Sequence, residues 1–235
     1  FGLAISQAIY PALSLQAARE DRPRLMDLVS QSLEVLLLFL VPATAGLMVL
    51  SRETVAFLFE RGSFTPTATR TTAEALFFYA LGLVAAGLAD VVAKAFYAQK
   101  DTRTPVRISV IGLLLNIVFN LVLIRPLAHK GLALATSLSS VFTCLVLTEL
   151  LRRKLGGLGG KELFRNFAKI GVATGTMCVA LFPLRRWAEV WWGYLGLVAV
   201  GVVIYGICVF LLRPRCIQII WKLVWREAHL RLRMK

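Results

Sequence analysis

Long apolar segments separated by short polar links dominate the chain. Six of them are long enough to cross a bilayer, because about 20 residues at about 1.5 Å each span a hydrocarbon core of about 30 Å. They cover residues 31–50, 74–98, 107–124, 131–151, 168–184 and 192–212. Residues 1–14 span only about 21 Å, and we interpret them as the end of a crossing in a longer protein. The pattern predicts an all-α, polytopic membrane protein with about seven transmembrane helices, the first one partial.

Polar residues and helix breakers mark the links. Thr65 followed by Pro66 predicts a helix start, because threonine caps helices and proline favours the first helical position. The string Asp101-Thr102-Arg103-Thr104-Pro105 predicts the end of one helix and the start of the next. The glycines between 156 and 160 lie in a segment, 153–167, that we expect to be a Gly-rich and basic cytoplasmic linker.

Composition supports a membrane protein and argues against a nucleic-acid partner. The chain is 58% hydrophobic and only 17% charged, whereas soluble domains are about 45–50% apolar and about 25% charged. The formal net charge of +14 would also suit a nucleic-acid binder, but such a protein does not need several bilayer-length apolar runs. The basic excess is therefore expected to face membrane surfaces.

Positive charge is distributed unequally between the two predicted sides of the membrane. When alternate links are assigned to opposite sides, nineteen of the 27 lysines and arginines fall on one side and seven on the other, with Lys94 inside a crossing. Cytoplasmic links carry the excess of Lys and Arg. The richer side, which includes the C-terminus, is therefore predicted to be cytoplasmic.

The tail, residues 214–235, has the pattern of an amphipathic helix rather than of another span. One face carries apolar residues at helical spacing, among them Trp221 and Trp225, and the other carries cations such as Lys222, Arg226 and Arg233. A helix lying among anionic headgroups accounts for both faces. The alternative is a helix that docks on another segment of the protein.

Two charged residues at membrane depth are the first candidate site. Asp90 and Lys94 are four residues apart and share a helix face. Charged groups inside a membrane are costly and usually face a bundle interior or a water-filled cavity. They could line a substrate cavity, or form a self-neutralising pair whose lysine extends toward the cytoplasmic headgroups.

Polar stripes on two further helices are the second candidate site. One stripe is Ser109, Gly112, Asn116 and Asn120, and the other includes Thr136, Ser140 and Thr143. Such stripes pack helices closely and form hydrogen bonds between them. In the alternative interpretation, Asn116, Asn120 and Thr136 supply oxygens to a cation, although the group contains no carboxylate.

Known catalytic motifs are absent from the sequence. It contains no phosphate-binding glycine loop, no Gly-x-Ser-x-Gly, no His-Glu-x-x-His and no workable pair of carboxylates, so we expect no enzyme activity. The two histidines are isolated, so no metal site is expected. Arg61, beside the short amphipathic stretch 52–60, is interpreted as a cap of a surface element or as an outer-rim contact for a substrate phosphate or sugar.

Three strings in the chain resemble the MurJ/MviN family of lipid II flippases, within the multidrug/oligosaccharidyl-lipid/polysaccharide (MOP) exporter superfamily. They are Ile9-Tyr10-Pro11-Ala12-Leu13-Ser14, Leu58-Phe59-Glu60-Arg61-Gly62-Ser63-Phe64-Thr65 and Ala95-Phe96-Tyr97-Ala98-Gln99-Lys100-Asp101-Thr102-Arg103-Thr104-Pro105-Val106. The third is the most specific. The resemblance covers nearly the whole chain, and after Gly160 it is limited to hydropathy and the charge of the tail.

The resemblance implies a larger architecture. Family members have two six-helix lobes around a central cavity, followed by two helices that form a lipid-facing groove. By this resemblance, residues 1–152 are helices of the second lobe and 168–213 hold the two additional helices. A cation site of some members falls on Asn116, Asn120, the Leu132 carbonyl and Thr136, with Asn120 in place of a carboxylate.

The resemblance also implies a function. We expect part of a flippase that moves an undecaprenyl-pyrophosphate-linked peptidoglycan precursor to the outer leaflet of the bacterial cytoplasmic membrane by alternating access. Candidate cavity residues are Asp90, Lys94, Asn116, Asn120, Thr136 and Ser140. Expected partners are the lipid substrate, anionic lipids and a preceding N-terminal lobe. No resident cofactor is expected. Na⁺, H⁺ or the membrane potential could drive transport. The alternatives are another MOP-type exporter, of polysaccharide-lipids or drugs, and a non-transporting scaffold or channel subunit.

Overall fold

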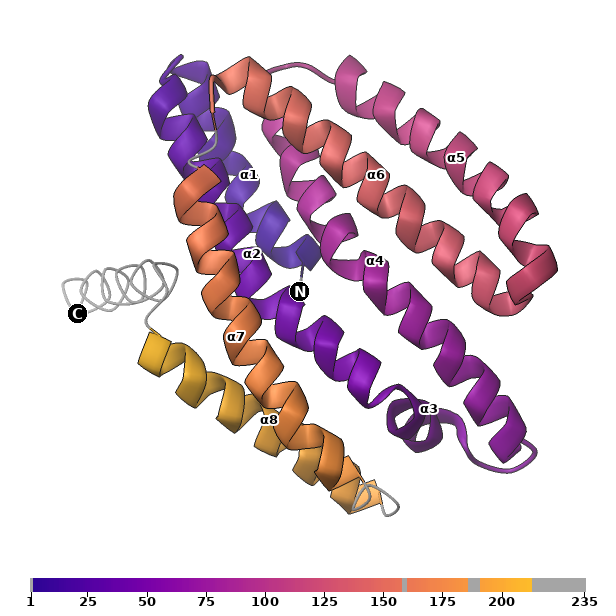
Figure 1. Cartoon of the computed structure of the whole chain (residues 1–235). Coiled ribbons are helices and arrows are strands. Elements are labelled where there is room, and N and C mark those ends of the chain that lie inside the picture. The colour runs from indigo at the N-terminus through magenta and orange to yellow at the C-terminus, as the bar shows by residue number, and fades with distance from the viewer. Residues whose placement is uncertain (1, 158–159, 186–190, 213–235) are drawn as a thin grey trace, which may run out of the picture.

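Eight α-helices make up the part of the chain that this computed structural model describes, residues 2–157, 160–185 and 191–212 (Figure 1). Six of them are long and apolar enough to cross a membrane, and the described residues contain no strand, which confirms the predicted all-α membrane class. The helices are α1 (Gly2–Ala18), α2 (Arg22–Val49), α3 (Ser51–Phe59), α4 (Pro66–Ala98), α5 (Arg103–Leu127), α6 (His129–Leu155), α7 (Gly160–Leu184) and α8 (Trp191–Leu212).

The helices extend beyond the apolar runs that predicted them. Helix α4 begins at Pro66, and the Thr65 hydroxyl accepts a hydrogen bond from the Ala68 amide at 3.3 Å, as the capping pattern predicted. The predicted linker 153–167 is wrong in its extent, because α6 continues to Leu155 and α7 already begins at Gly160. Hydropathy marks only the hydrocarbon part of a helix, whereas the internally bonded helix continues through the headgroup layer. The amphipathic tail, 214–235, lies outside the described residues.

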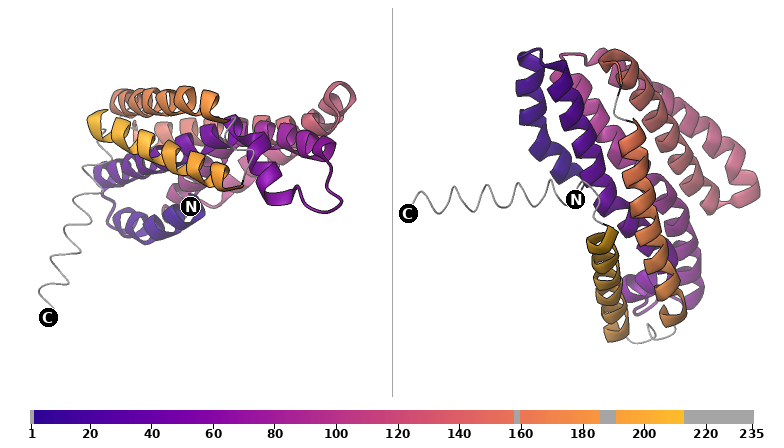
Figure 2. Two further views of the ribbon diagram at one scale, coloured as in Figure 1. Left: turned by 90° about the horizontal axis from the view of Figure 1, so that it is seen from below. Right: turned by 60° about the vertical axis from the view of Figure 1, so that its left-hand side comes forward.

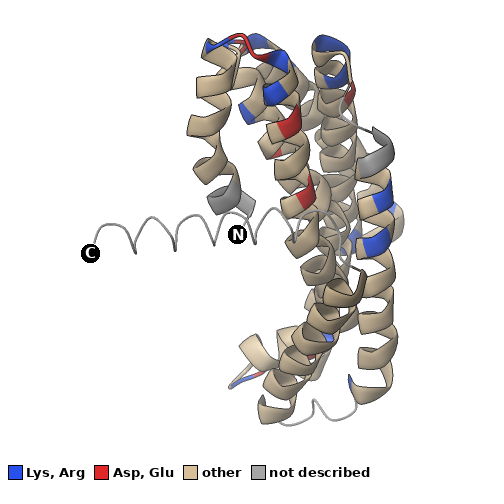
Figure 3. Cartoon of the chain, turned by 90° about the vertical axis from the view of Figure 1, so that its left-hand side faces the viewer, with Lys and Arg blue, Asp and Glu red and all other residues tan. Residues whose placement is uncertain are grey.

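Helices α2 and α4 occupy the middle of the bundle, and α5 and α8 lie at opposite edges (Figures 1 and 2). Charged residues are densest at one end of the bundle, several lie part-way along the helices, and few lie at the other end (Figure 3). The end with the α1–α2, α4–α5 and α6–α7 links is the one predicted to be cytoplasmic from its lysines and arginines. The opposite end, with α3, is called the outer end below.

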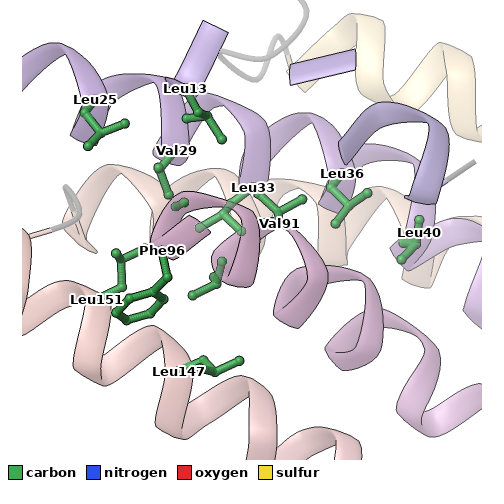
Figure 4. Packing of buried hydrophobic residues seen from close by; sticks show 12 residues of the cluster. Leu13, Leu25, Val29, Leu33, Leu36, Leu40, Val91, Phe96, Leu147 and Leu151 are labelled. Atoms are coloured by element: carbon green, nitrogen blue, oxygen red, sulfur yellow. The ribbon is translucent and has the colours of Figure 1, made fainter. Parts of the chain in front are cut away.

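The largest apolar cluster joins four helices near the cytoplasmic end (Figure 4). Its centre is Phe96 of α4, which is 1% exposed and lies beside Leu147 and Leu151 of α6. Leucines and valines of α1 and α2 complete it. Because lipid tails are as apolar as leucine, this packing stabilises the bundle by close contact rather than by removal of water.

The link between α4 and α5 is held by one carboxylate. Asp101 accepts hydrogen bonds from the amide and the hydroxyl of Thr104, both at 3.1 Å, at the start of α5. Its other partner is Lys154 at the end of α6, with 2.8 Å between Nζ and Oδ2. The hydrogen bond from Lys154 holds the pKa of Asp101 below its ordinary value. The string that resembles a known family therefore joins three helices at the membrane surface.

Helices α4 and α6 approach most closely at Gly82. A Cβ atom at this position would lie 2.6 Å from the Cα of Ser137, so only glycine fits without movement of the backbone. Ser137 is 3% exposed, and its hydroxyl donates to the Phe78 carbonyl of α4. This is the small-residue contact that membrane helices use to bring two backbones together.

We expect Gly82→Ala to lower the free energy of unfolding by about 1–3 kcal/mol, because the added methyl group forces α4 and α6 apart. The measurement is the melting temperature of the detergent-purified protein. Gly171→Ala is the matched control, since a Cβ there meets no atom within 4 Å. Equal melting temperatures for the two variants would contradict the close approach.

Tyr205 of α8 compensates for a proline in α2. Pro42 has no amide hydrogen, so the carbonyl four residues earlier, that of Leu38, lacks its partner within the helix. The Tyr205 hydroxyl donates to this carbonyl at 2.6 Å. An unpaired carbonyl in hydrocarbon costs free energy, so this bond both satisfies α2 and attaches α8 to it.

We expect Tyr205→Phe to destabilise the protein by about 1 kcal/mol. In a Pro42→Ala background the same substitution should cost less, because alanine at this position provides the amide hydrogen that the Leu38 carbonyl lacks. A double-mutant cycle of melting temperatures measures this coupling. Additive effects would show that Tyr205 does not act through the carbonyl freed by Pro42.

Candidate functional site

A pocket of about 300 Å³ lies between α4, α5 and α6. We call it the amide–hydroxyl pocket, after the Asn116 amide and the hydroxyls that line it. Its lining consists of Ala86, Ala89, Ser109, Gly112, Leu113, Asn116, Thr136, Ser139, Ser140 and Thr143. The two polar stripes expected from the sequence therefore face each other, and Asn116, Thr136 and Ser140 meet in one place.

Hydrogen bonds connect the side chains of this pocket. The Asn116 amide donates to the Thr136 hydroxyl at 3.4 Å and to the Ser139 hydroxyl at 3.3 Å. Asn120, one turn further along α5, donates to the Asn116 side-chain oxygen at 3.0 Å. Ser140 donates to the Thr136 carbonyl at 2.9 Å. The two Asn116 bonds join α5 to α6, the other two lie within single helices, and the pocket stays open beside them.

The residues of the expected cation site hydrogen-bond mainly to one another. The Leu132 carbonyl accepts a bond from the Thr136 hydroxyl at 3.1 Å, and the Asn116 oxygen already accepts one from Asn120. Among these candidate oxygens, that of Asn120 is the one buried without a partner. The described residues contain no cluster of three or more acidic, histidine or cysteine ligands. The group offers neutral amide, hydroxyl and carbonyl oxygens but no carboxylate, so the cation site stays a prediction.

Asp90 and Lys94 lie beside this pocket rather than in its lining. Lys94 Nζ is 3.2 Å from the Asp90 carboxylate, and the Ser6 hydroxyl of α1 lies between them, donating to Asp90 and accepting from Lys94. The Lys94 side chain is 15% exposed and that of Asp90 is 34% exposed. The pair therefore neutralises itself and fixes α1 to α4, while Asp90 remains partly open. The sequence analysis missed Ser6, because α1 brings it there only in the tertiary structure.

The amide–hydroxyl pocket and the Asp90–Lys94 pair lie on the same face of α4. Ala86 of the pocket, Asp90 and Lys94 are spaced four residues apart, so they form one stripe along the helix. The Ala86 side chain is small and leaves the stripe open between the two groups. The Lys94–Asp90–Ser6 group and the hydroxyls of α6 therefore lie along one side of α4, with Ala86 between them; we call these polar groups together the polar surface.

Arg61 lies at the outer end and is exposed. Its guanidinium donates to the Phe57 carbonyl at 3.4 Å, near the end of α3. This bond favours the capping interpretation over a contact with substrate, because an arginine can satisfy the last carbonyls of a helix.

Glu34 is a membrane-embedded acid that the sequence analysis did not single out. It is 3% exposed, and its Oε2 atom is buried without a hydrogen-bond partner. It lies on α2 one turn before Leu37 and Leu38, which pack in the apolar cluster with α7. Its place at the edge of the apolar run 31–50 gave no signal that it would be buried.

Comparison with known proteins identifies the family. The family model described as "Lipid II flippase MurJ" matches residues 1–203. The chain belongs to the MurJ family. It is 32% identical over 230 residues to a probable lipid II flippase MurJ of Vibrio cholerae, covering 92% of this chain and 43% of that protein. It is 30% identical over 205 residues to that of Thermotoga maritima, covering 87% and 41%.

A solved MurJ structure shares the fold. The chain superposes on "Lipid II flippase MurJ, inward closed conformation" with a TM-score of 0.76 and 24% sequence identity, over 91% of this chain and 43% of that one. This MurJ-family chain therefore spans less than half the length of these relatives. The family description names a flippase, which is a transporter, and names no catalytic activity.

We expect Asp90→Asn to destabilise this MurJ-family protein by about 1–2 kcal/mol, because Lys94 then keeps a charge without a carboxylate inside the membrane. Adding Lys94→Met should recover most of that loss. Melting temperatures of the single and double variants in detergent test this. Glu149→Gln, at an exposed ion pair, is the control and should cost under about 0.5 kcal/mol. A double variant no more stable than Asp90→Asn would refute the coupling.

Proposed function

We propose that this chain acts as part of a lipid II flippase, which moves an undecaprenyl-pyrophosphate-linked precursor from the inner to the outer leaflet by alternating access. The observation that carries the proposal is the polar surface across α1, α4, α5 and α6, within a chain of the MurJ family. It contains Asp90, Lys94, Asn116, Thr136 and Ser140, with Asn120 one turn further along α5.

A polar surface at membrane depth lowers the barrier that such a lipid meets. An anionic head group in hydrocarbon costs at least several kcal/mol, since even a single charged side chain at the bilayer centre does. Hydroxyl, amide and ammonium groups can replace the lost water around the head, while the polyprenyl tail stays among lipid tails. Helix α5 has suitable apolar faces, since Leu121 and Val122 are 68% and 61% exposed.

The surface is one wall of a cavity, and a preceding N-terminal lobe of the same protein would supply the other. The protein would lie in the bacterial cytoplasmic membrane with its C-terminus in the cytoplasm, as the charge distribution predicts. Residues 214–235 would bind anionic lipids. The lining of the amide–hydroxyl pocket contains neither a carboxylate nor another titratable side chain, so its chemistry favours coupling to the membrane potential over binding of Na⁺ or H⁺ in this pocket.

A non-transporting scaffold would need these polar groups sealed in dry contacts. The open pocket beside Asn116 and the partial exposure of Asp90 favour a cavity wall instead. Another exporter of the same superfamily is the second candidate, and the family match favours lipid II as the cargo.

The test uses a full-length protein that contains this chain, reconstituted in liposomes with a labelled lipid II analogue. We expect Asn116→Leu to slow translocation about tenfold, since one hydrogen bond to a charged head group contributes about 1.5–3 kcal/mol. We expect Asp90→Ala to slow it as well, because Lys94 loses the carboxylate that holds it in place. Val118→Leu, on the exposed apolar side of α5, is the matched control. Replacing Na⁺ by K⁺ should leave the rate unchanged.

Gel filtration of each variant separates a loss of folding from a loss of transport. Wild-type rates for well-folded Asn116→Leu and Asp90→Ala would remove the polar surface from the transport path. Transport by residues 1–235 alone would contradict the need for a second lobe.

A further inference from the structure

A second pocket lies at the outer end, between α3 and α4. It has a volume of about 240 Å³ and is lined by Ser51, Arg52, Arg70, Ala73, Glu74, Phe77 and Phe78. Nothing in the proposed transport path uses these residues. We call it the outer arginine pocket.

The charges around this pocket favour an anion. Glu74 is paired with Lys130 of α6 at 2.8 Å and with Arg70 at 3.6 Å, so its charge is already compensated. Within the described part of the chain Arg52 has no ion-pair partner. The first turn of α3, which contains Ser51 and Arg52, has no side-chain cap hydrogen bond, and Glu53 in the same turn offsets part of the positive potential of its amide groups.

The charged side chains of the pocket lie nearer the outer end of α4, and its aromatic side chains lie deeper along the helix. Arg70 lies in the second turn of α4, and Phe77 is about 10 Å deeper along the helix. Phe77 and Phe78 pack edge to face, with ring centroids 5.6 Å apart. Because α4 enters the membrane in this direction, the arginines lie at the height of the headgroups and the phenylalanines at the height of the acyl chains. A ligand that fits both levels is a phosphate attached to a lipid.

The pocket faces away from the proposed transport path. Glu74 and Asp90 are sixteen residues apart on α4, which places them about 160° apart around the helix at about 100° per residue. Asp90 faces α1, so the outer arginine pocket opens on the opposite side of the helix. A transported lipid head on the Asp90 side would not reach it.

We propose that the outer arginine pocket binds the phosphate of an anionic phospholipid of the outer leaflet, with Arg52 and Arg70 as the phosphate contacts and Phe77 and Phe78 against the first acyl carbons. Arginine suits this role because its planar guanidinium can bind two phosphate oxygens at once. The bound lipid would connect the start of α3 to α4.

The experiment measures lipid binding to a delipidated, detergent-purified full-length protein that contains this chain. Native mass spectrometry and melting temperature are recorded with phosphatidylglycerol, phosphatidylcholine or inorganic phosphate. The wild type should bind phosphatidylglycerol more tightly than phosphatidylcholine. Each arginine near an anionic lipid contributes about fivefold in affinity, so Arg52→Gln/Arg70→Gln should weaken phosphatidylglycerol binding about 25-fold.

Two further variants make the result specific. Arg125→Gln, an exposed arginine at the outer end of α5, is the matched control and should bind as the wild type does. Arg52→Lys/Arg70→Lys keeps the charge and should keep most of the preference for phosphatidylglycerol, so it also serves if the glutamine variant does not fold.

Three results would overturn the proposal. The first is equal binding of phosphatidylglycerol by the wild type and Arg52→Gln/Arg70→Gln. The second is an arginine-dependent stabilisation by inorganic phosphate as large as that by the lipid, which would assign the pocket to soluble anions. The third is displacement of phosphatidylglycerol by an equimolar polyprenyl pyrophosphate, which would assign it to the cargo. None of them bears on the polar surface around Asp90, so this proposal and the proposed function fail separately.

Discussion

Backbone amide and carbonyl groups inside the hydrocarbon need hydrogen-bond partners within the protein, because lipid tails offer none. The backbone meets this condition by forming helices. Polar groups that lack a partner within their own helix bond to a neighbouring helix, and these bonds help to determine how the helices associate. Pro42 frees the Leu38 carbonyl, and Tyr205 of α8 satisfies it. Ser137 bonds to a carbonyl of α4 at the place where Gly82 allows the closest approach. The same requirement therefore joins α8 to α2 and α6 to α4.

Several polar side chains inside the bundle gather on one side of α4. Ser6, Asp90 and Lys94 satisfy one another, and Asn116 joins α5 to α6, yet Asp90 is partly exposed and Asn116 borders an open pocket. A protein that only had to pack could have used alanine or leucine at these positions at lower cost. In a chain of the MurJ family, this surface is the basis of the proposed passage of an acidic lipid head.

The two pockets lie on different sides of α4. The amide–hydroxyl pocket and Asp90 lie along one stripe of α4, whereas Arg52, Arg70 and the phenylalanines gather around another part of its circumference. Helix α4 thus separates the proposed cargo surface from the pocket proposed to bind a resident lipid. Its periodicity allows this, because residues half a turn apart meet different neighbours.

The sequence by itself determined the membrane class, the six spans, the cap at Thr65 and the two polar stripes, because hydropathy and helical spacing are local properties. It also indicated the family through the string around Asp101. Only the tertiary structure showed that Ser6 joins Asp90 and Lys94, that Glu34 is buried, and that Arg52 and Arg70 share a pocket. These relations depend on which helices become neighbours, and local spacing does not encode them. The linker after Leu151 is shorter than hydropathy predicts for a related reason. Hydropathy reports where the hydrocarbon layer ends, whereas α6 continues beyond that layer. The helix ends only at Gly156, whose φ is 84°.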